Sequence, residues 1–191
     1  MDDRAPRSPL RLPLAVVCAA LCVAGAAHAG SAPPFAARAG LELASAAAQA
    51  WSADAALVYV ENDEALDGAG VSPRWSYLFY SASEDRARLW SVRGGRIAAA
   101  ENLDMRFDAP PVASGWLDSG AALAAAERGG GAEFRKDHGG RLETMLLMRG
   151  AFSEGEPDET TWTLVYRAQG VPSLFVVVSA ADGKVQRTWR G

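Results

Sequence analysis

Cysteine and histidine are almost absent from this chain of 191 residues. It contains two of each, and Cys18, Cys22 and His28 all lie within the first 29 residues. His138 is therefore the single histidine of the remainder. Without thiols, the remainder can form no disulfide, no cysteine-rich zinc site and no cysteine nucleophile.

Long hydrophobic runs are also lacking, apart from Leu12–Ala27. This run follows a weakly basic segment and precedes the sequence AHA ending at Ala29, which has the small-x-small pattern of a cleavage site. We expect a signal peptide cleaved near Ala29 and a periplasmic or secreted protein without a membrane span after cleavage. The alternative is an uncleaved anchor, although the run is shorter than the ~20 residues that span a bilayer comfortably. A lipoprotein is disfavoured, because Leu21 precedes Cys22 where lipobox cleavage requires a small residue.

An excess of basic residues is the third absence. The chain has 19 Lys and Arg against 23 Asp and Glu, and the first 29 residues hold three and two of these, so the remainder has a net charge of −5. Proteins that bind nucleic acid present a basic patch. None is visible, so we expect no nucleic-acid partner.

Two stretches with the same pattern dominate what is present. Each has an Ala-rich helical segment, a short apolar strand, and a hairpin that begins at tryptophan and closes with a glycine turn. Trp162 follows Trp75 by 87 residues, and Gly183 follows Gly95 by 88. We expect an α+β protein of two tandem repeats, each a helix packed on a small antiparallel β-sheet. The alternative is that two ordinary hairpins both begin with tryptophan.

The pattern predicts the domain organisation. The proline-bearing sequence DAPPVASG separates the two stretches and reads as a linker. We expect a signal peptide at 1–29, a first repeat at 30–107, the linker at 108–115 and a second repeat at 116–191. Within the repeats, the apolar periodicity predicts helices after Leu41 and Ser119, with Gly129–Gly131 weakening or breaking the second.

The second repeat resembles the PepSY domain family. The matching features are the Ala-rich helix, Trp162 at the beginning of a strand, the valine-rich strand Phe175–Val178 and the closing sequence Ala181–Val185. Asp182 and Gly183 are adjacent in this chain, whereas the family separates them. The first repeat matches more weakly, because two glycines replace the Asp-Gly turn. The resemblance implies a helix on a cystatin-like sheet, export, an inhibitory or partner-binding role, and no catalytic residues.

Aromatic and basic side chains supply the candidate binding surface. Most tryptophans lie in strand patterns and are expected in the core. We nevertheless expect a partner-binding surface at Trp90, Trp116, Trp189 and Arg88. No cofactor motif or metal-ligand spacing is found, so neither a cofactor nor a metal is expected.

These observations lead to three hypotheses of function. The preferred one is a non-catalytic binding or regulatory module that engages an envelope protein or peptide, with peptidase inhibition implied by the family resemblance. The second is a small-ligand-binding periplasmic protein. The third is a hydrolase that uses His138, which lies in the sequence KDHGG beside Asp137.

Overall fold

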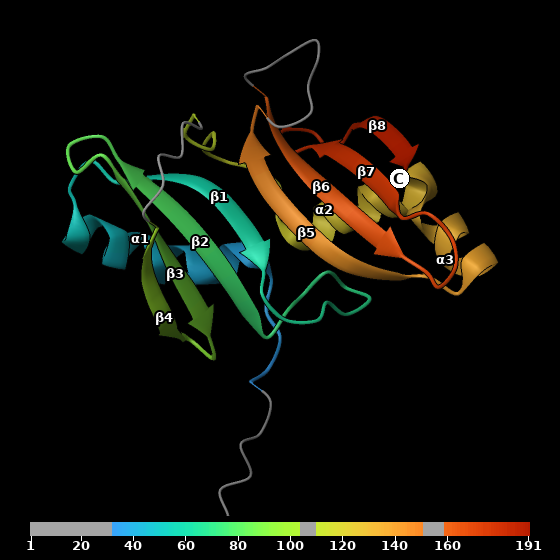
Figure 1. The fold of residues 1–191 in the computed structure, drawn as a ribbon, viewed down its shortest axis with the longest axis horizontal. Helices are drawn as coiled ribbons and strands as arrows, with labels where there is room; N and C mark the ends of the chain where they lie inside the picture. Colours follow the sequence, from blue (N-terminus) through green and yellow to red (C-terminus); the bar gives the residue numbers. More distant parts are fainter. Residues whose placement is uncertain (1–31, 104–109, 151–158) are drawn as a thin grey trace, which may run out of the picture. The chain divides into compact units, whose positions relative to one another are not determined.

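The computed structural model describes residues 32–103, 110–150 and 159–191 (Figure 1). The expected signal peptide and residues 108–109 of the expected linker lie outside the described residues. The elements follow one another as η1 (Ala37–Gly40), α1 (Leu41–Trp51), β1 (Ala56–Asn62), β2 (Arg74–Ser81), β3 (Arg86–Arg93), β4 (Arg96–Leu103), α2 (Ser119–Ala126), η2 (Glu127–Gly131), α3 (Ala132–His138), β5 (Arg141–Arg149), β6 (Thr160–Arg167), β7 (Leu174–Ser179) and β8 (Val185–Arg190).

The strands form one antiparallel sheet in the order β4-β3-β2-β1-β5-β6-β7-β8. Consecutive strands pair as hairpins on either side of the centre, as the tryptophan-initiated patterns predict. At the centre, β1 pairs with β5 through Tyr59–Glu61 and Leu146–Met148. We call this short central pairing the seam.

The expected architecture of two tandem repeats, each with its own small sheet, is wrong. The seam joins all eight strands into one continuous sheet, and the described residues form one compact unit. The physical reason is a shared core: the rings of Trp75 and Trp162 meet edge to face with centroids 6.2 Å apart, and both are fully buried. The coarser expectation of antiparallel strands combined with helices is confirmed.

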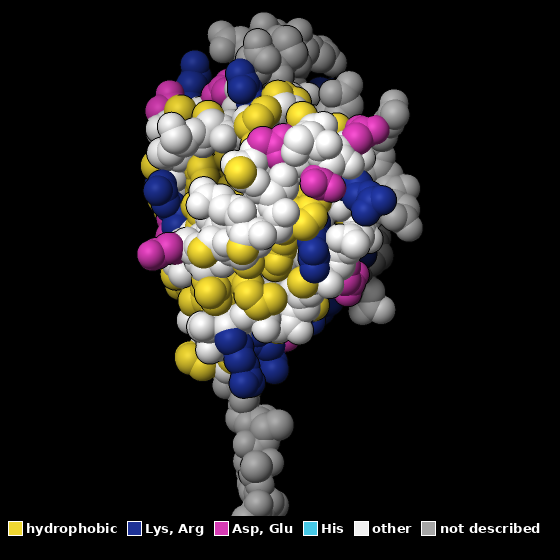
Figure 2. Space-filling view, turned by 90° about the vertical axis from the view of Figure 1, so that its left-hand side faces the viewer, with side chains coloured by type: hydrophobic (Ala, Val, Ile, Leu, Met, Phe, Trp, Pro, Cys, Tyr) yellow, Lys and Arg dark blue, Asp and Glu magenta, His cyan; other side chains and the backbone are white. Residues whose placement is uncertain are grey.

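Helices α1 and α2 lie behind the sheet in the view of Figure 1, against the same face. α1 contacts β2 and β3, and α2 contacts β6 and β7. Alternation along the strands directs tryptophan, tyrosine and other large side chains toward the helices. The face of α1 that carries Ala44 and Ala48 completes this core. Leu43 lies on its outer side, and Figure 2 shows hydrophobic side chains gathered on this end of the sheet.

The second helical stretch bends where its glycines predicted a break. Gly130 has φ of 116°, a backbone conformation that a side chain would strain. A Cβ atom at Gly131 would collide with the Tyr166 hydroxyl, so glycine is needed for η2 to lie this close to the sheet. The bend separates α2 from α3 and lets η2 pack against β7 and β8.

A carboxylate ties the loop before β1 to the β2–β3 turn. Asp54 accepts hydrogen bonds from the hydroxyls of Ser52, Ser81 and Ser83, at 2.6–2.9 Å, and from the Ser83 amide at 2.8 Å. These bonds, that of Ser52 first, hold the pKa of Asp54 well below its ordinary value. The charged form is therefore stabilised in the folded state.

Removing the Trp162 ring should destabilise the whole sheet. The ring contacts Trp116 at 5.7 Å between centroids, and its Nε1 donates to the Leu117 carbonyl oxygen. We expect Trp162→Ala to lower the free energy of unfolding by about 3–5 kcal/mol and Trp162→Phe to lower it less. Urea denaturation followed by circular dichroism measures the loss, with the half-buried Trp189→Ala as control. An equal loss in the control would contradict the assignment of Trp162 to a shared core.

The hydrogen bonds that Asp54 accepts predict a pH-dependent contribution to the stability of the fold. Because its pKa is depressed in the folded state, the contribution is present above the unfolded value of about 3.9 and is lost as pH falls through the folded value. We expect Asp54→Asn to lower the melting temperature at pH 7, and the difference from the native chain to shrink in acid. Asp137→Asn, at an exposed position of α3, is the control. A difference that grows in acid would overturn this account.

Candidate functional site

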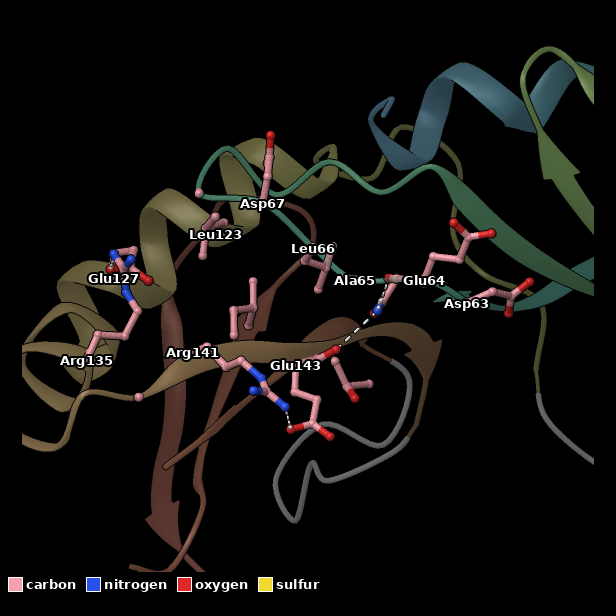
Figure 3. A pocket seen from close by; sticks show the side chains of 15 residues that line it. Asp63, Glu64, Ala65, Leu66, Asp67, Leu123, Glu127, Arg135, Arg141 and Glu143 are labelled. Atoms are coloured by element: carbon pink, nitrogen blue, oxygen red, sulfur yellow. Dashed lines mark hydrogen bonds and ion pairs between the residues drawn. The ribbon is translucent and has the colours of Figure 1, made fainter. Parts of the chain in front are cut away.

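The candidate site is a cavity of about 620 Å³ at one end of the seam (Figure 3). Pairing between β1 and β5 stops at Glu61 and Leu146. Beyond this point β1 ends at Asn62 and the chain turns away from β5. The volume falls within the range of ordinary ligand pockets.

Two continuous segments form the long walls of this seam cavity. One is Asn62–Gly68, which leads away from β1, and the other is Gly140–Thr144, at the start of β5. Alternate residues of a strand point to opposite faces. A cavity lined by five consecutive residues of the β5 segment therefore lies along the edge of the strand. Among the described residues, no strand pairs with this part of that edge.

Asn62 occupies the edge of β5 next to the seam. Its Oδ1 accepts a hydrogen bond from the Met145 amide at 2.7 Å, and its Nδ2 donates to the Glu143 carbonyl oxygen at 3.1 Å. The same Nδ2 lies 3.0 Å from the Glu64 carbonyl oxygen. One amide side chain thus makes the contacts that the next residue of a neighbouring strand would make.

Three leucines give the seam cavity an apolar wall. Leu123 of α2 is buried, while Leu66 and Leu142 are half-buried and pack against the core. In Figure 3, Leu66 and Leu123 lie on the helix side of the β5 strand, and Arg141 and Glu143 point to its other side. The cavity therefore offers apolar contacts on one side and charged groups on the other.

The charged groups that line the cavity are largely neutralised by arginines. Ion pairs join Asp63 to Arg74 at 3.0 Å, Glu64 to Arg93 at 2.9 Å, Glu127 to Arg135, and Glu143 to Arg167 at 3.4 Å. Asp67 accepts hydrogen bonds from the amides of Ala69 and Val71 instead. Partly exposed pairs of this kind contribute little stability, about 0–1 kcal/mol each. They leave the cavity with no strong preference for a charged ligand.

A buried tyrosine holds the helix side of the cavity in place. The Tyr166 hydroxyl donates to Glu127 Oε1 at 2.9 Å. Burial, followed by the hydrogen bond and charge of Glu127, raises the pKa of Tyr166 far above its ordinary value. The phenol therefore remains a donor and keeps Glu127 oriented toward β6.

The opposite end of the seam is filled by the chain itself. The Val112 amide donates to the Leu57 carbonyl oxygen of β1 at 2.8 Å, and the Ala113 amide donates to Thr160 Oγ1 at 3.0 Å. Both residues belong to the expected linker. A segment without regular structure thus already occupies one splayed end of the seam.

Of the four residues of the expected binding surface, Arg88 and Trp90 are in contact, whereas Trp116 and Trp189 lie elsewhere. Trp90 is buried between Trp51 and Phe79, and Arg88 lies over its ring at 5.3 Å from the centroid. Trp116 is buried beside Trp162 and α2, with Arg38 over its ring. Trp189 stacks on Phe175, with centroids 4.9 Å apart, at the other edge of the sheet.

His138 lies exposed at the end of α3. Its ring contacts Phe134 at 5.1 Å between centroids, and its Nε2 lies 3.5 Å from Nη1 of Arg190. No hydroxyl or carboxylate is recorded in contact with it among the described residues. In the same part of the chain, no group of three or more His, Cys, Asp and Glu side chains is placed to hold a metal ion.

Asn62, Leu66 and Leu142 are the site residues that sequence reasoning missed. Asn62 and Leu66 lie in the polar sequence NDEALDGAG, and Leu142 begins the apolar sequence LETMLLM. Asparagine directly after a β-type run was the one available signal, because its amide can continue a hydrogen-bond ladder. Nothing in the sequence placed that loop beside β5.

Comparison with known proteins bears on the fold alone. No protein family model matches the chain, and no curated protein matches it. The crystal structure at 1.85 Å of a candidate lipoprotein from Clostridium difficile 630 is similar, with a TM-score of 0.51 and 12% sequence identity. The match covers 79% of this chain and 92% of that one. The two proteins therefore share the fold.

Asn62→Ala should destabilise the protein because it leaves the Met145 amide and the Glu143 carbonyl without a side-chain partner. We expect the free energy of unfolding to fall by about 1–3 kcal/mol in urea denaturation. Asn102→Ala, at an exposed position of β4, should stay within about 0.5 kcal/mol of the native chain. Equal effects of the two substitutions would show that the Asn62 bridge does not support the seam.

Proposed function

We propose that this chain is an exported, non-catalytic binding protein that accepts an extended segment of a partner polypeptide in the seam cavity. The observation that carries the proposal is the edge of β5 at Gly140–Thr144, which lines the cavity and pairs with no strand among the described residues. Extended peptides bind such edges by adding a strand, with main-chain hydrogen bonds supplying affinity and pockets supplying specificity.

The seam cavity suits a strand better than the outer edges of the sheet do. β4 and β8 are the edge strands, and all of their residues are exposed or half-buried. In the cavity, an added strand would lie between β5 and the Asn62–Gly68 segment. The added strand would be contacted on both sides, and its backbone would be shielded from water.

The chemistry of the lining supports recognition of backbone and apolar groups. Side chains directed to the helix side would meet Leu66, Leu123 and Leu142, whereas those directed to the other side would meet polar groups. Four of the five lining carboxylates already pair with arginines, so the net field is small. We therefore expect tolerance of different sequences and weak dependence on salt.

The cellular setting is part of the proposal. The apolar run and the AHA sequence at the start of the chain support export. In the described part of the chain, no helix has the length and apolar character needed to cross a membrane. The structurally similar protein is described as a candidate lipoprotein, and the PepSY resemblance implies partner-binding modules of the envelope. An envelope protein or peptide, with a peptidase as one such partner, fits this setting.

A small-molecule ligand is the second candidate, because the cavity volume alone would suit it. The peptide is preferred because the cavity follows a strand edge over five residues. The hydrolase hypothesis receives the least support, since the exposed ring of His138 contacts Phe134 and Arg190.

A matched pair of peptides tests the proposal. The probe is a fluorescein-labelled peptide, Thr-Val-Thr-Leu-Thr, and its partner carries N-methyl groups on alternate amides, which removes main-chain donors. We expect the first to bind in fluorescence anisotropy and the second to bind about tenfold more weakly or worse, since two lost hydrogen bonds cost about 1–3 kcal/mol. Equal affinity, or no binding of either peptide, would overturn strand addition.

Variants locate the binding within the chain. Leu66→Glu should weaken peptide binding about tenfold or more, because a charge replaces an apolar contact at a half-buried loop position. Leu43→Glu changes a leucine of α1 outside the cavity and should leave peptide affinity unchanged. Circular dichroism confirms that both variants fold. Weakened binding in Leu43→Glu together with unchanged binding in Leu66→Glu would place the peptide outside the seam cavity.

A further inference from the structure

The apolar surface of helix α1 extends beyond the face that packs on the sheet, although Glu42 and Gln49 are exposed beside it. Ala44 and Ala48 are fully buried against the sheet. Leu43, Ala46 and Ala50 are exposed and recur at spacings of three and four residues, which places them in one stripe. The sheet therefore covers only part of the apolar surface of α1.

Leu43 is the clearest member of this outer stripe. It is 36% exposed, and it is the single large hydrophobic side chain classed as exposed in the described part of the chain. Isolated surface leucines are ordinary features of proteins and need no partner. Leu43 is different because a groove lies directly beside it.

The groove runs between α1 and the β3–β4 turn and has a volume of about 530 Å³. We call it the α1 groove, and its lining is mainly apolar: Pro33, Pro34, Phe35, Ala39, Leu43, Ala46 and Val92. Gly94 and Gly95 form its far rim, and a Cβ atom at Gly95 would meet nothing within 4 Å. Figure 2 shows hydrophobic side chains gathered on this end of the molecule, with Lys and Arg side chains beside them.

The protruding leucine and the hollow lie on the same surface, which makes that surface self-complementary. An interface between identical chains related by a two-fold axis uses the same patch twice. When the two-fold axis runs along the groove, the α1 side of the groove in one copy faces the β3–β4 turn of the other copy. Leu43 of each copy then meets the side-chain-free rim at Gly94 and Gly95.

The charges at the two rims favour the same arrangement. Glu42 lines the groove on the α1 rim and is exposed, and Arg96 is exposed directly after Gly95 on the turn rim. A two-fold axis along the groove brings the acidic group of each copy toward the basic group of the other. Complementary charges of this kind select the correct partner and orientation.

We propose that the α1 groove is the interface of a homodimer, with a second copy of this chain as its occupant. The apolar stripe and groove form the centre of the interface, and Glu42 and Arg96 form its rim, the usual division of a specific protein interface. The proposal is independent of peptide binding, because no residue that lines the α1 groove lines the seam cavity.

Sedimentation velocity over a wide concentration range, with the exported chain, tests the interface. We expect a reversible dimer for the native chain and a dimer dissociation constant raised at least tenfold in Leu43→Glu. Gly95→Asn, which adds a side chain where nothing lies within 4 Å, should also weaken the dimer. Asparagine tolerates the positive φ of this position better than most residues. Leu43→Met should preserve the dimer.

Charge reversal tests the two-fold arrangement. Glu42→Arg and Arg96→Glu should each weaken the dimer, and the double variant should restore it, because the opposing charges are then exchanged. Circular dichroism checks folding of every variant. A native chain that stays monomeric at all concentrations would overturn the proposal. So would a monomer that binds anionic phospholipid vesicles and loses this binding in Leu43→Glu, because the groove would then face a lipid surface.

Discussion

The short pairing between β1 and β5 is the interaction on which the rest of this structure depends. Tyr59–Glu61 and Leu146–Met148 are the paired residues that turn two four-stranded hairpin arrays into one sheet. The tryptophans behind it make the union stable, because Trp75 and Trp162 contact each other in the core and Trp116 contacts Trp162. A sheet continuous through its centre forces both helices to share one apolar interior.

The brevity of the seam explains where the chain has room for a ligand. Strands twist relative to their neighbours, and a pairing this short lets them separate at both ends. One end is closed by the segment that carries Val112, which donates to Leu57. The other end is bridged by Asn62 and then opens into the seam cavity, where the edge of β5 continues to Arg141 without a partner strand in the described residues. The continuous sheet and the cavity therefore depend on the same short pairing.

Local structure could be predicted from the sequence, but the seam between β1 and β5 could not. The alternation after Trp75 and Trp162 predicts the hairpins, and the glycines at 129–131 predict the bend after α2. Those signals act over a few residues. The pairing of Tyr59 with Met148 joins residues 89 positions apart through backbone hydrogen bonds, which leave no periodicity in the sequence. The seam cavity could not be predicted for the same reason, because its walls come from a polar loop and a strand that meet only in the folded chain.

Amide hydrogen exchange tests the central claim, that an incoming strand pairs with the open edge of β5. Those amides of Gly140–Glu143 that point away from β6 should exchange rapidly in the free protein, because no strand covers them on the cavity side. Saturating Thr-Val-Thr-Leu-Thr peptide should slow exchange in this segment and leave β4 and β8 unchanged. Slowed exchange along β4 or β8, with Gly140–Glu143 unaffected, would contradict the account and place the binding edge on the outside of the sheet.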